Sequence, residues 1–508
     1  NKEQKTLFIM RLFFLFLLLS ALTFTAPQLA ANNISVNGLN VTQDMTTQDV
    51  QVTFSISWQN SWSVTTAPAN HDAAWIFAKY QVNGNDWQHL PMPASWTQSP
   101  NTATVEVVAG TGAMMSRSAA GIGSVNFINN QFVIPYADLG LADEDVLDIR
   151  VFAVEMVYVP SGNFFVGDRD QAGIPGTLPG FYTLSGTLPI SKTPYEVAGE
   201  GELPVSLQGL YYSSDYGDQQ GPIPAAFPKG WGDFYCMKYE LSQQQYVDFF
   251  NTLTGVQQEE NLPITAAEEF SIGYTVDFSP DNPELFVAST SFPDVPAGAL
   301  PTFTYLTYLD WAGLRPPTEL EYEKACRGPL EPVEGEFAWG TNGIVTVADR
   351  AEGYDISSRG QFNSRITDPV SGKGNANYSW IDDGGFGTFL NPFMRCGVFA
   401  ASAATQNREE TGATYYGIME MAGNMPELTI SVSTPNGRAF TGQHGDGVIS
   451  ADGRSNVTNW PTDTESTDYI LRGGSLIDID PVQLQISNRT SEFDTSFGIF
   501  QIRGIRSL

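Results

Sequence analysis

The sequence predicts two structural parts, an all-β sandwich of the immunoglobulin-like type and a following α+β region. In residues 32–154, short runs of alternating apolar and polar residues are separated by Gly, Asn, Pro and Ser, which is typical of a sandwich. After residue 155, two helical periods follow Ser and Thr caps within loop-rich sequence. A chain of 508 residues is long enough for two or three domains with their own cores.

Residues 1–31 have the pattern of a signal peptide. Met10 and Arg11 precede the apolar run LFFLFLLLSALTFTA, and the small residues Ala30 and Ala31 follow it. Met10 is a second candidate for the start codon. The run is shorter than the roughly 20 apolar residues that a membrane-spanning helix needs. We therefore expect a secreted protein, extracellular or periplasmic, with no membrane span.

The clearest strand of the β module lies at residues 50–58. Val50, Val52, Phe54, Ile56 and Trp58 alternate with polar residues, which gives one buried and one wetted face. Further strands are expected at residues 74–80, 104–108, 131–136 and 146–154. The last of these runs into residue 156 without a linker, so a rigid junction with the α+β region is expected.

Two helices are predicted in the α+β region. Ser242 and Gln245 have the spacing of a capping box, and apolar residues then recur at helical spacing as far as Leu253. Thr318 and Glu321 repeat the capping pattern, and we expect that second helix to stop at Gly328.

Charge and cysteine content narrow the classes of function. The net charge of −31 argues against nucleic acid or anionic membranes as partners, because phosphates would be repelled. The three cysteines, Cys236, Cys326 and Cys396, allow at most one disulfide. The apolar neighbours of Cys236 and Cys326 favour buried structural thiols over a catalytic one. With only three histidines, two of them in the β module, a three-histidine iron site is not expected.

Five motifs carry a family resemblance. They lie, in order over about 350 residues, at residues 156–168, 234–254, 314–328 with 337–340, 416–427 and 471–476, the last reading LRGGSL. Together they resemble the formylglycine-generating enzymes, also called sulfatase-modifying factors. The resemblance implies a C-type-lectin-like fold for residues 155–508, with residues 170–228 as a long loop insertion.

The reactive part of the family pattern is absent. The resemblance implies two copper-binding cysteines at the third and eighth positions after Ser475, and these positions hold Asp478 and Gln483. Cuprous ion prefers thiolates to carboxylate and amide oxygens, so copper is not expected. If the resemblance holds residue by residue, a binding cleft is lined by Arg472, Ser475, Asp478 and Gln483.

The family resemblance also implies calcium. One site would be formed by Gly423, Asn424, Met425 and Glu427, although Pro426 stands where relatives have Trp. A second, less secure site would be formed by Asn377, Tyr378, Asp382 and Asp383. The alternative at both places is an Asx-rich turn without metal.

Three functions are compatible with these observations. The first is a non-catalytic member of the family, a pseudoenzyme that binds an extracellular protein or glycan, or has a structural role. The second is a metal-dependent oxidase that modifies a protein side chain, in which Asp478 and Asp480 would take part. The third is self-assembly through the β module. The missing cysteines favour the first.

Overall fold

The structure is a computed structural model of the chain. It describes residues 33–169, 181–185, 191–204, 210–212, 221–263, 273–280, 282, 284–346, 356–357, 365–366, 372–379, 393–403, 405, 407–461, 468–489 and 500–508. The predicted signal peptide lies outside these residues. No helix in this part of the chain is long and apolar enough to span a membrane.

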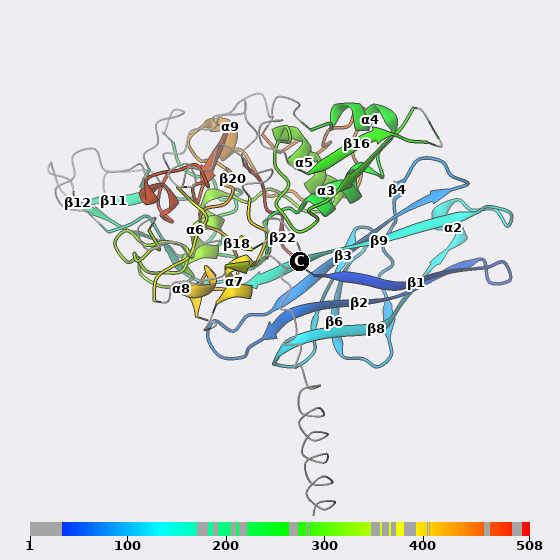
Figure 1. The fold of residues 1–508 in the computed structure, drawn as a ribbon, viewed down its shortest axis with the longest axis horizontal. Helices are drawn as coiled ribbons and strands as arrows, with labels where there is room; N and C mark the ends of the chain where they lie inside the picture. The colour runs from blue at the N-terminus through cyan, green and yellow to red at the C-terminus, as the bar shows by residue number, and fades with distance from the viewer. Residues whose placement is uncertain are drawn as a thin grey trace, which may run out of the picture.

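One layer of the N-terminal part is an antiparallel four-stranded sheet in the order β1-β2-β8-β5 (Figure 1). Its strands are β1 Ser35–Asp44, β2 Asp49–Ser63, β8 Gly121–Pro135 and β5 Trp96–Gln98. The alternation predicted for residues 50–58 is confirmed, because the five apolar side chains are at most 1% exposed. They pack in one core with Ala74, Ile76 and Met115 of a second sheet.

The second sheet is larger, and it contains strands from both parts of the chain. Its order is β22-β15-β9-β3-β7-β6, with β4 beside β3. The strands are β3 Asp72–Val82, β4 Gln88–His89, β6 Ala103–Val108, β7 Gly112–Arg117, β9 Leu147–Val159, β15 Phe234–Met237 and β22 Ile505–Arg506. The boundary expected between residues 154 and 155 falls inside β9, which pairs with β3 and also with β15.

Both predicted helices are present, with their capping boxes. In α3 (Gln243–Phe250) the Ser242 side chain accepts from the Gln245 N–H, and in α6 (Glu319–Arg327) Thr318 does the same for Glu321. Gly328, with φ of 69°, ends α6 as predicted. Helix α3 stops three residues before Leu253, which is still buried. Two further helices, α4 (Gly255–Glu260) and α5 (Thr302–Trp311), were not predicted.

The remaining elements are short and connect long loops. They are α2 Tyr136–Leu139, β10 Phe164–Val166, β11 Phe181–Ser185, β12 Ser191–Thr193, β13 Tyr195–Val197, β14 Leu210–Tyr212, β16 Tyr274–Phe278, β17 Phe286–Thr290, β18 Ile356–Ser357, β19 Arg365–Ile366, α7 Val398–Ser402, α8 Arg408–Thr411, β20 Glu427–Ile430, α9 Pro435–Arg438, β21 Tyr469–Arg472 and the 3-10 helix η5 Pro481–Leu484. The region predicted as a loop insertion therefore contains strands β11 to β14.

Candidate binding site

The candidate site forms where strands β20 and β21 meet. The two strands are antiparallel, and Glu427 lies opposite Arg472. The chain entering β20 and the chain leaving β21 are therefore neighbours. The Gly423 N–H donates to the Gly473 carbonyl at 2.8 Å, and the Leu476 N–H donates to the Asn424 carbonyl at 3.0 Å. Residues separated by about fifty positions in sequence are brought together in this way.

Two glycines permit the turn that follows β21. Gly473 and Gly474 have φ of 85° and 65°, a region that side chains other than glycine rarely adopt. A Cβ on Gly473 would lie 2.6 Å from the Met421 carbonyl oxygen, and one on Gly474 would lie 2.8 Å from Leu484. The Gly-Gly-Ser motif is thus a steric requirement of this turn.

Asp478 closes the same turn. Its carboxylate accepts from the Ser475 N–H at 2.5 Å and from the Ser475 hydroxyl at 3.0 Å. Its carbonyl accepts from the Ser379 N–H at 2.8 Å. Partial burial raises the pKa of Asp478, the two bonds from Ser475 oppose that rise, and Asp480 adds to it. Asp478 therefore stabilises the backbone at the position where the family resemblance implies a thiolate.

The backbone of Gln483 packs against the turn at Gly474. Gln483 belongs to η5, and its N–H donates to the Asp480 carbonyl at 3.1 Å. The Gln483 carbonyl would be 3.0 Å from a Cβ on Gly474. Ser475, Asp478 and Gln483 thus lie at or beside one turn, with Ser475 buried and the other two half-buried.

Arg472, the fourth predicted cleft residue, lies in a buried ionic network. Its guanidinium contacts Glu319 at 3.1 Å and Glu323 at 2.6 Å, and it donates to the Ile486 carbonyl at 2.6 Å. Arg489 binds the same Glu319 at 2.6 Å. The side chain of Arg472 is 0% exposed, so it lies in the interior of the protein at the end of β21. Its ionic contacts stabilise that strand end.

Two side chains of the first predicted calcium set accept from protein donors. The side-chain amide oxygen of Asn424 accepts from the Asn377 side chain and the Met394 N–H, each at 3.0 Å. Glu427 accepts from Arg503 at 2.7 Å and from Gln501. The Arg503 guanidinium already neutralises Glu427. Calcium bound by Gly423, Asn424, Met425 and Glu427 therefore stays a prediction.

The second predicted set is described only in part. Asn377 joins Asn424 through the bond given above, and the Tyr378 hydroxyl donates to the Val345 carbonyl at 3.0 Å. Asp382 and Asp383 lie outside the described residues, so calcium there stays a prediction. Within the described ranges, no group of three or more His, Cys, Asp and Glu side chains is arranged to hold a metal ion.

Glu240 is a site residue to which the sequence assigned no role. Its carboxylate accepts from the Asn424 amide at 2.8 Å and from the Met425 N–H at 3.3 Å. Burial raises its pKa well above the ordinary value, and the charge of Arg503 opposes that rise. The one sequence feature that could have pointed to Glu240 is its position in Lys-Tyr-Glu at residues 238–240, within the family motif at residues 234–254.

All three cysteines are free and buried, which confirms the burial predicted for Cys236 and Cys326. Burial raises the pKa of the Cys326 thiol to about 12, and it also raises the pKa of Cys236 and Cys396. These thiols are therefore protonated near neutral pH, which disfavours both nucleophilic attack and metal binding.

An apolar rim lies beside the turn. Leu476 packs in a small cluster with Val295, Phe393 and Met425, and Ile477 contacts this cluster from its edge. Ile479 is 63% exposed and follows Asp478 directly. The cluster itself is buried, so Ile479 is the apolar side chain that this turn presents to solvent.

The site is therefore a turn at the end of β21 that two glycines make possible, and this turn contains no pair of cysteine thiolates. A family model described as "Sulfatase-modifying factor enzyme 1-like domain" matches residues 213–507. The chain belongs to this family, and the resemblance predicted from its motifs is confirmed. No curated protein is similar enough to the chain to match it.

Proposed function

We propose that this protein is an exported, non-catalytic member of the sulfatase-modifying factor family that binds an extracellular protein or glycan. One observation carries the proposal: the carboxylate of Asp478 is used to hold the turn at Ser475. The family's oxidation chemistry depends on two cysteine thiolates, and the family resemblance implies them at the positions that Asp478 and Gln483 occupy here. The three thiols of this chain are buried elsewhere and protonated.

The finer features of the fold belong to the same proposal. The two sheets that share the N-terminal core support an immunoglobulin-like sandwich, although strand β9 continues beyond it. The short strands and long loops around α3 and α6 support a C-type-lectin-like fold for the rest. Both architectures commonly present loops for recognition, which agrees with a binding role.

Loss of the cysteine pair is tested by restoring it. We expect the unaltered protein to bind no stoichiometric copper(I) and to leave the cysteine of a substrate peptide unoxidised in mass spectrometry. The double variant Asp478→Cys with Gln483→Cys should gain copper(I) binding, because the glycine turn already positions both residues. Conversion of cysteine to formylglycine by the unaltered protein would overturn the proposal and favour the oxidase.

The binding surface is tested with two matched substitutions. Ile479→Glu places a charge beside the site, and Ile122→Glu places one on β8, where the native side chain is 82% exposed. We expect Ile479→Glu to weaken binding to a glycan array or to extracellular matrix protein by about tenfold, and Ile122→Glu to leave it unchanged. The opposite ranking, together with loss of self-association, would favour assembly through the β module.

Calcium at the Asn377 loop is proposed separately. The carboxylates of Asp382 and Asp383 would supply hard oxygen ligands beside Asn377. Calorimetric titration of the protein with calcium should give binding that Asp382→Asn abolishes and that Asp480→Asn leaves unchanged. An equal loss in both variants would contradict this site.

A further inference from the structure

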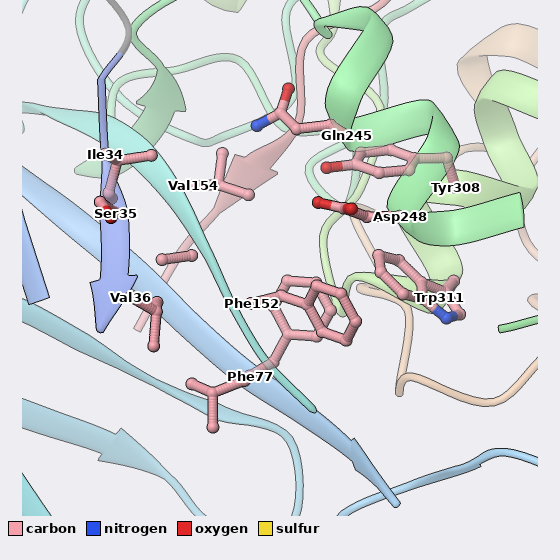
Figure 2. Close-up of a pocket in the computed structure, with 12 residues that line it drawn as sticks. Ile34, Ser35, Val36, Phe77, Phe152, Val154, Gln245, Asp248, Tyr308 and Trp311 are labelled. Atoms are coloured by element: carbon pink, nitrogen blue, oxygen red, sulfur yellow. The ribbon is translucent and has the colours of Figure 1, made fainter. Parts of the chain in front are cut away.

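A pocket of about 280 Å³ lies between the N-terminal strands and helices α3 and α5. None of the residues that line it belongs to the turn at Ser475. Figure 2 shows Ile34 and, in β1, Val36 on one side, Val154 and Phe152 of β9 between, and side chains of α3 and α5 on the other side. All the residues that line the pocket belong to the described part of the chain. Both the N-terminal β strands and the family domain are needed to form this pocket.

The helical wall is polar and acidic. Asp248 from α3 and Tyr308 from α5 point their oxygens toward the strands, and Gln245 points its amide in the same direction (Figure 2). Asp248 accepts one hydrogen bond, from the Gln244 side chain at 2.8 Å. No salt bridge to Asp248 is found among the described residues. Burial raises its pKa, and the hydrogen bond from Gln244 opposes that rise.

Arg150 is a positive charge near Asp248, but its side chain is engaged elsewhere. The charge of Arg150 lowers the pKa of Asp248, but this effect is smaller than the effect of burial. The Arg150 guanidinium stacks on the Trp87 ring at 4.3 Å from its centroid, and the residue is exposed to solvent. Asp248 therefore keeps a net attraction for a further cation.

The base of the pocket is aromatic. The Phe152 and Trp311 rings have centroids 5.0 Å apart, and both contact the Phe77 ring, at 5.5 Å and 5.0 Å. The Lys79 side-chain nitrogen lies 4.8 Å from the Trp311 centroid and donates to the Trp311 and Gly447 carbonyls, and burial lowers the pKa of Lys79 well below its ordinary value. Aromatic faces near a carboxylate are the usual surroundings of a bound organic ammonium ion.

We propose that this pocket binds a small organic ammonium ion, with Asp248 as its counter-ion and the rings of Phe152 and Trp311 as its apolar surface. The single carboxylate excludes anionic ligands. A neutral ligand would leave that carboxylate without a counter-charge after water is expelled. The volume fits a group the size of choline rather than a larger ligand, since drug-sized ligands occupy roughly 300–1,000 Å³.

The test compares choline with its neutral isostere, in which a quaternary carbon replaces the nitrogen. Calorimetric titration of the full chain should show binding of choline and of tetramethylammonium, and at least about tenfold weaker binding of the isostere. Equal affinity for choline and the isostere would overturn the proposal. Absence of binding by both ammonium ions at millimolar concentration would overturn it as well.

Two substitutions locate the site, and one serves as the control. Asp248→Asn should weaken choline binding by about tenfold, and Phe152→Leu should weaken it by a smaller factor, since it removes one ring face. Asp138→Asn changes the same charge on an exposed position of α2 and should leave the affinity unchanged. Circular dichroism of each variant reports folding. A folded Asp248→Asn variant that binds choline as well as Asp138→Asn does would disprove the assignment.

Discussion

At the scale of single residues, the molecule depends on charges that water does not reach. Arg472 binds both Glu319 and Glu323, and all three side chains are 0% exposed. Arg489 pairs with Glu319, and Arg327 pairs with Glu323. A buried charge is tolerated only when it is paired and hydrogen-bonded. Removal of one member therefore leaves its partners under-compensated.

We predict that Arg472→Met lowers the free energy of unfolding by about 3–5 kcal/mol, because Glu319 and Glu323 each lose a counter-charge in the interior. The matched control is Arg169→Met, since Arg169 pairs with Glu331 at 2.6 Å on the surface, with side chains 56% and 67% exposed. That substitution should cost about 0–1 kcal/mol. Urea denaturation measures both, and equal costs would contradict the buried network.

His444 gives a prediction for pH. Its Nε2 accepts from the Ser507 N–H at 3.0 Å, and burial, with Arg315 and Arg506 nearby, lowers its pKa to about 2 from 6.5. Between pH 6.5 and about pH 2, His444 is therefore protonated in the unfolded chain and neutral in the folded chain. This histidine's contribution to stability is complete above pH 6.5 and is lost as the pH falls below it.

The measurement compares the unaltered protein with His444→Gln, which keeps a hydrogen-bond acceptor. Unfolding free energies between pH 7 and pH 5 should fall more steeply for the unaltered protein than for the variant. Parallel curves would show that His444 does not contribute to the acid sensitivity.

At the scale of elements, the three capping boxes differ in their surroundings. Thr318 at α6 is 0% exposed, and its hydroxyl also donates to the Pro228 carbonyl at 2.9 Å. Thr254 caps the short helix α4 and is half-buried. The same motif therefore has a larger effect at α6.

We predict that Thr318→Ala destabilises the protein by about 2 kcal/mol and Thr254→Ala by about 1 kcal/mol. The Thr318 variant loses both the cap and the bond to Pro228, and the Thr254 variant loses only the cap. Thermal unfolding of both variants in one buffer measures the ranking. A larger loss for Thr254→Ala would be inconsistent with it.

Helix α5 shows why some elements could not be predicted. Its sequence TFTYLTYLDW is rich in Thr, Tyr and Phe, which favour strands, and nine of its ten residues are buried. A helix that is apolar on nearly all sides has no amphipathic period to recognise. Helices α3 and α6 were predictable because a capping motif precedes an amphipathic sequence in each, whereas the capping box of the six-residue helix α4 precedes the polar sequence GVQQEE.

The same distinction applies to the site. The glycine turn at Gly473 and Gly474 was readable because its requirement is local. The surroundings of Arg472 were not, because Glu319 and Glu323 are about 150 residues away in sequence. The contact of Glu240 with Asn424 is likewise a product of the fold, so the sequence could name Glu240 only as part of a motif.

At the scale of the whole molecule, strand β9 belongs to both parts. Trp75 of β3 is fully buried and donates to the Ala312 carbonyl at 2.7 Å, and Lys238 binds Glu155 at 3.0 Å and Asp72 at 3.5 Å. All these contacts join N-terminal strands to the family domain. The two parts are therefore energetically coupled.

We predict a single cooperative unfolding transition for residues 33–508. Trp75→Ala should lower the midpoint of the whole transition, with a loss of about 3–5 kcal/mol, because it leaves a cavity and an unpaired carbonyl in the shared core. Differential scanning calorimetry with near-ultraviolet circular dichroism checks it. Two separate transitions, only one of which moves in the variant, would contradict the coupling.

The continuity of β9 has a consequence for multivalent binding. Two binding regions joined by a flexible linker search a volume set by the linker length, and their effective concentration falls as the linker grows. Here one hydrogen-bonded strand replaces a linker, so any two surfaces on the two parts keep a fixed separation and angle. A target with two epitopes would be held with avidity only if its own spacing matched that of the protein.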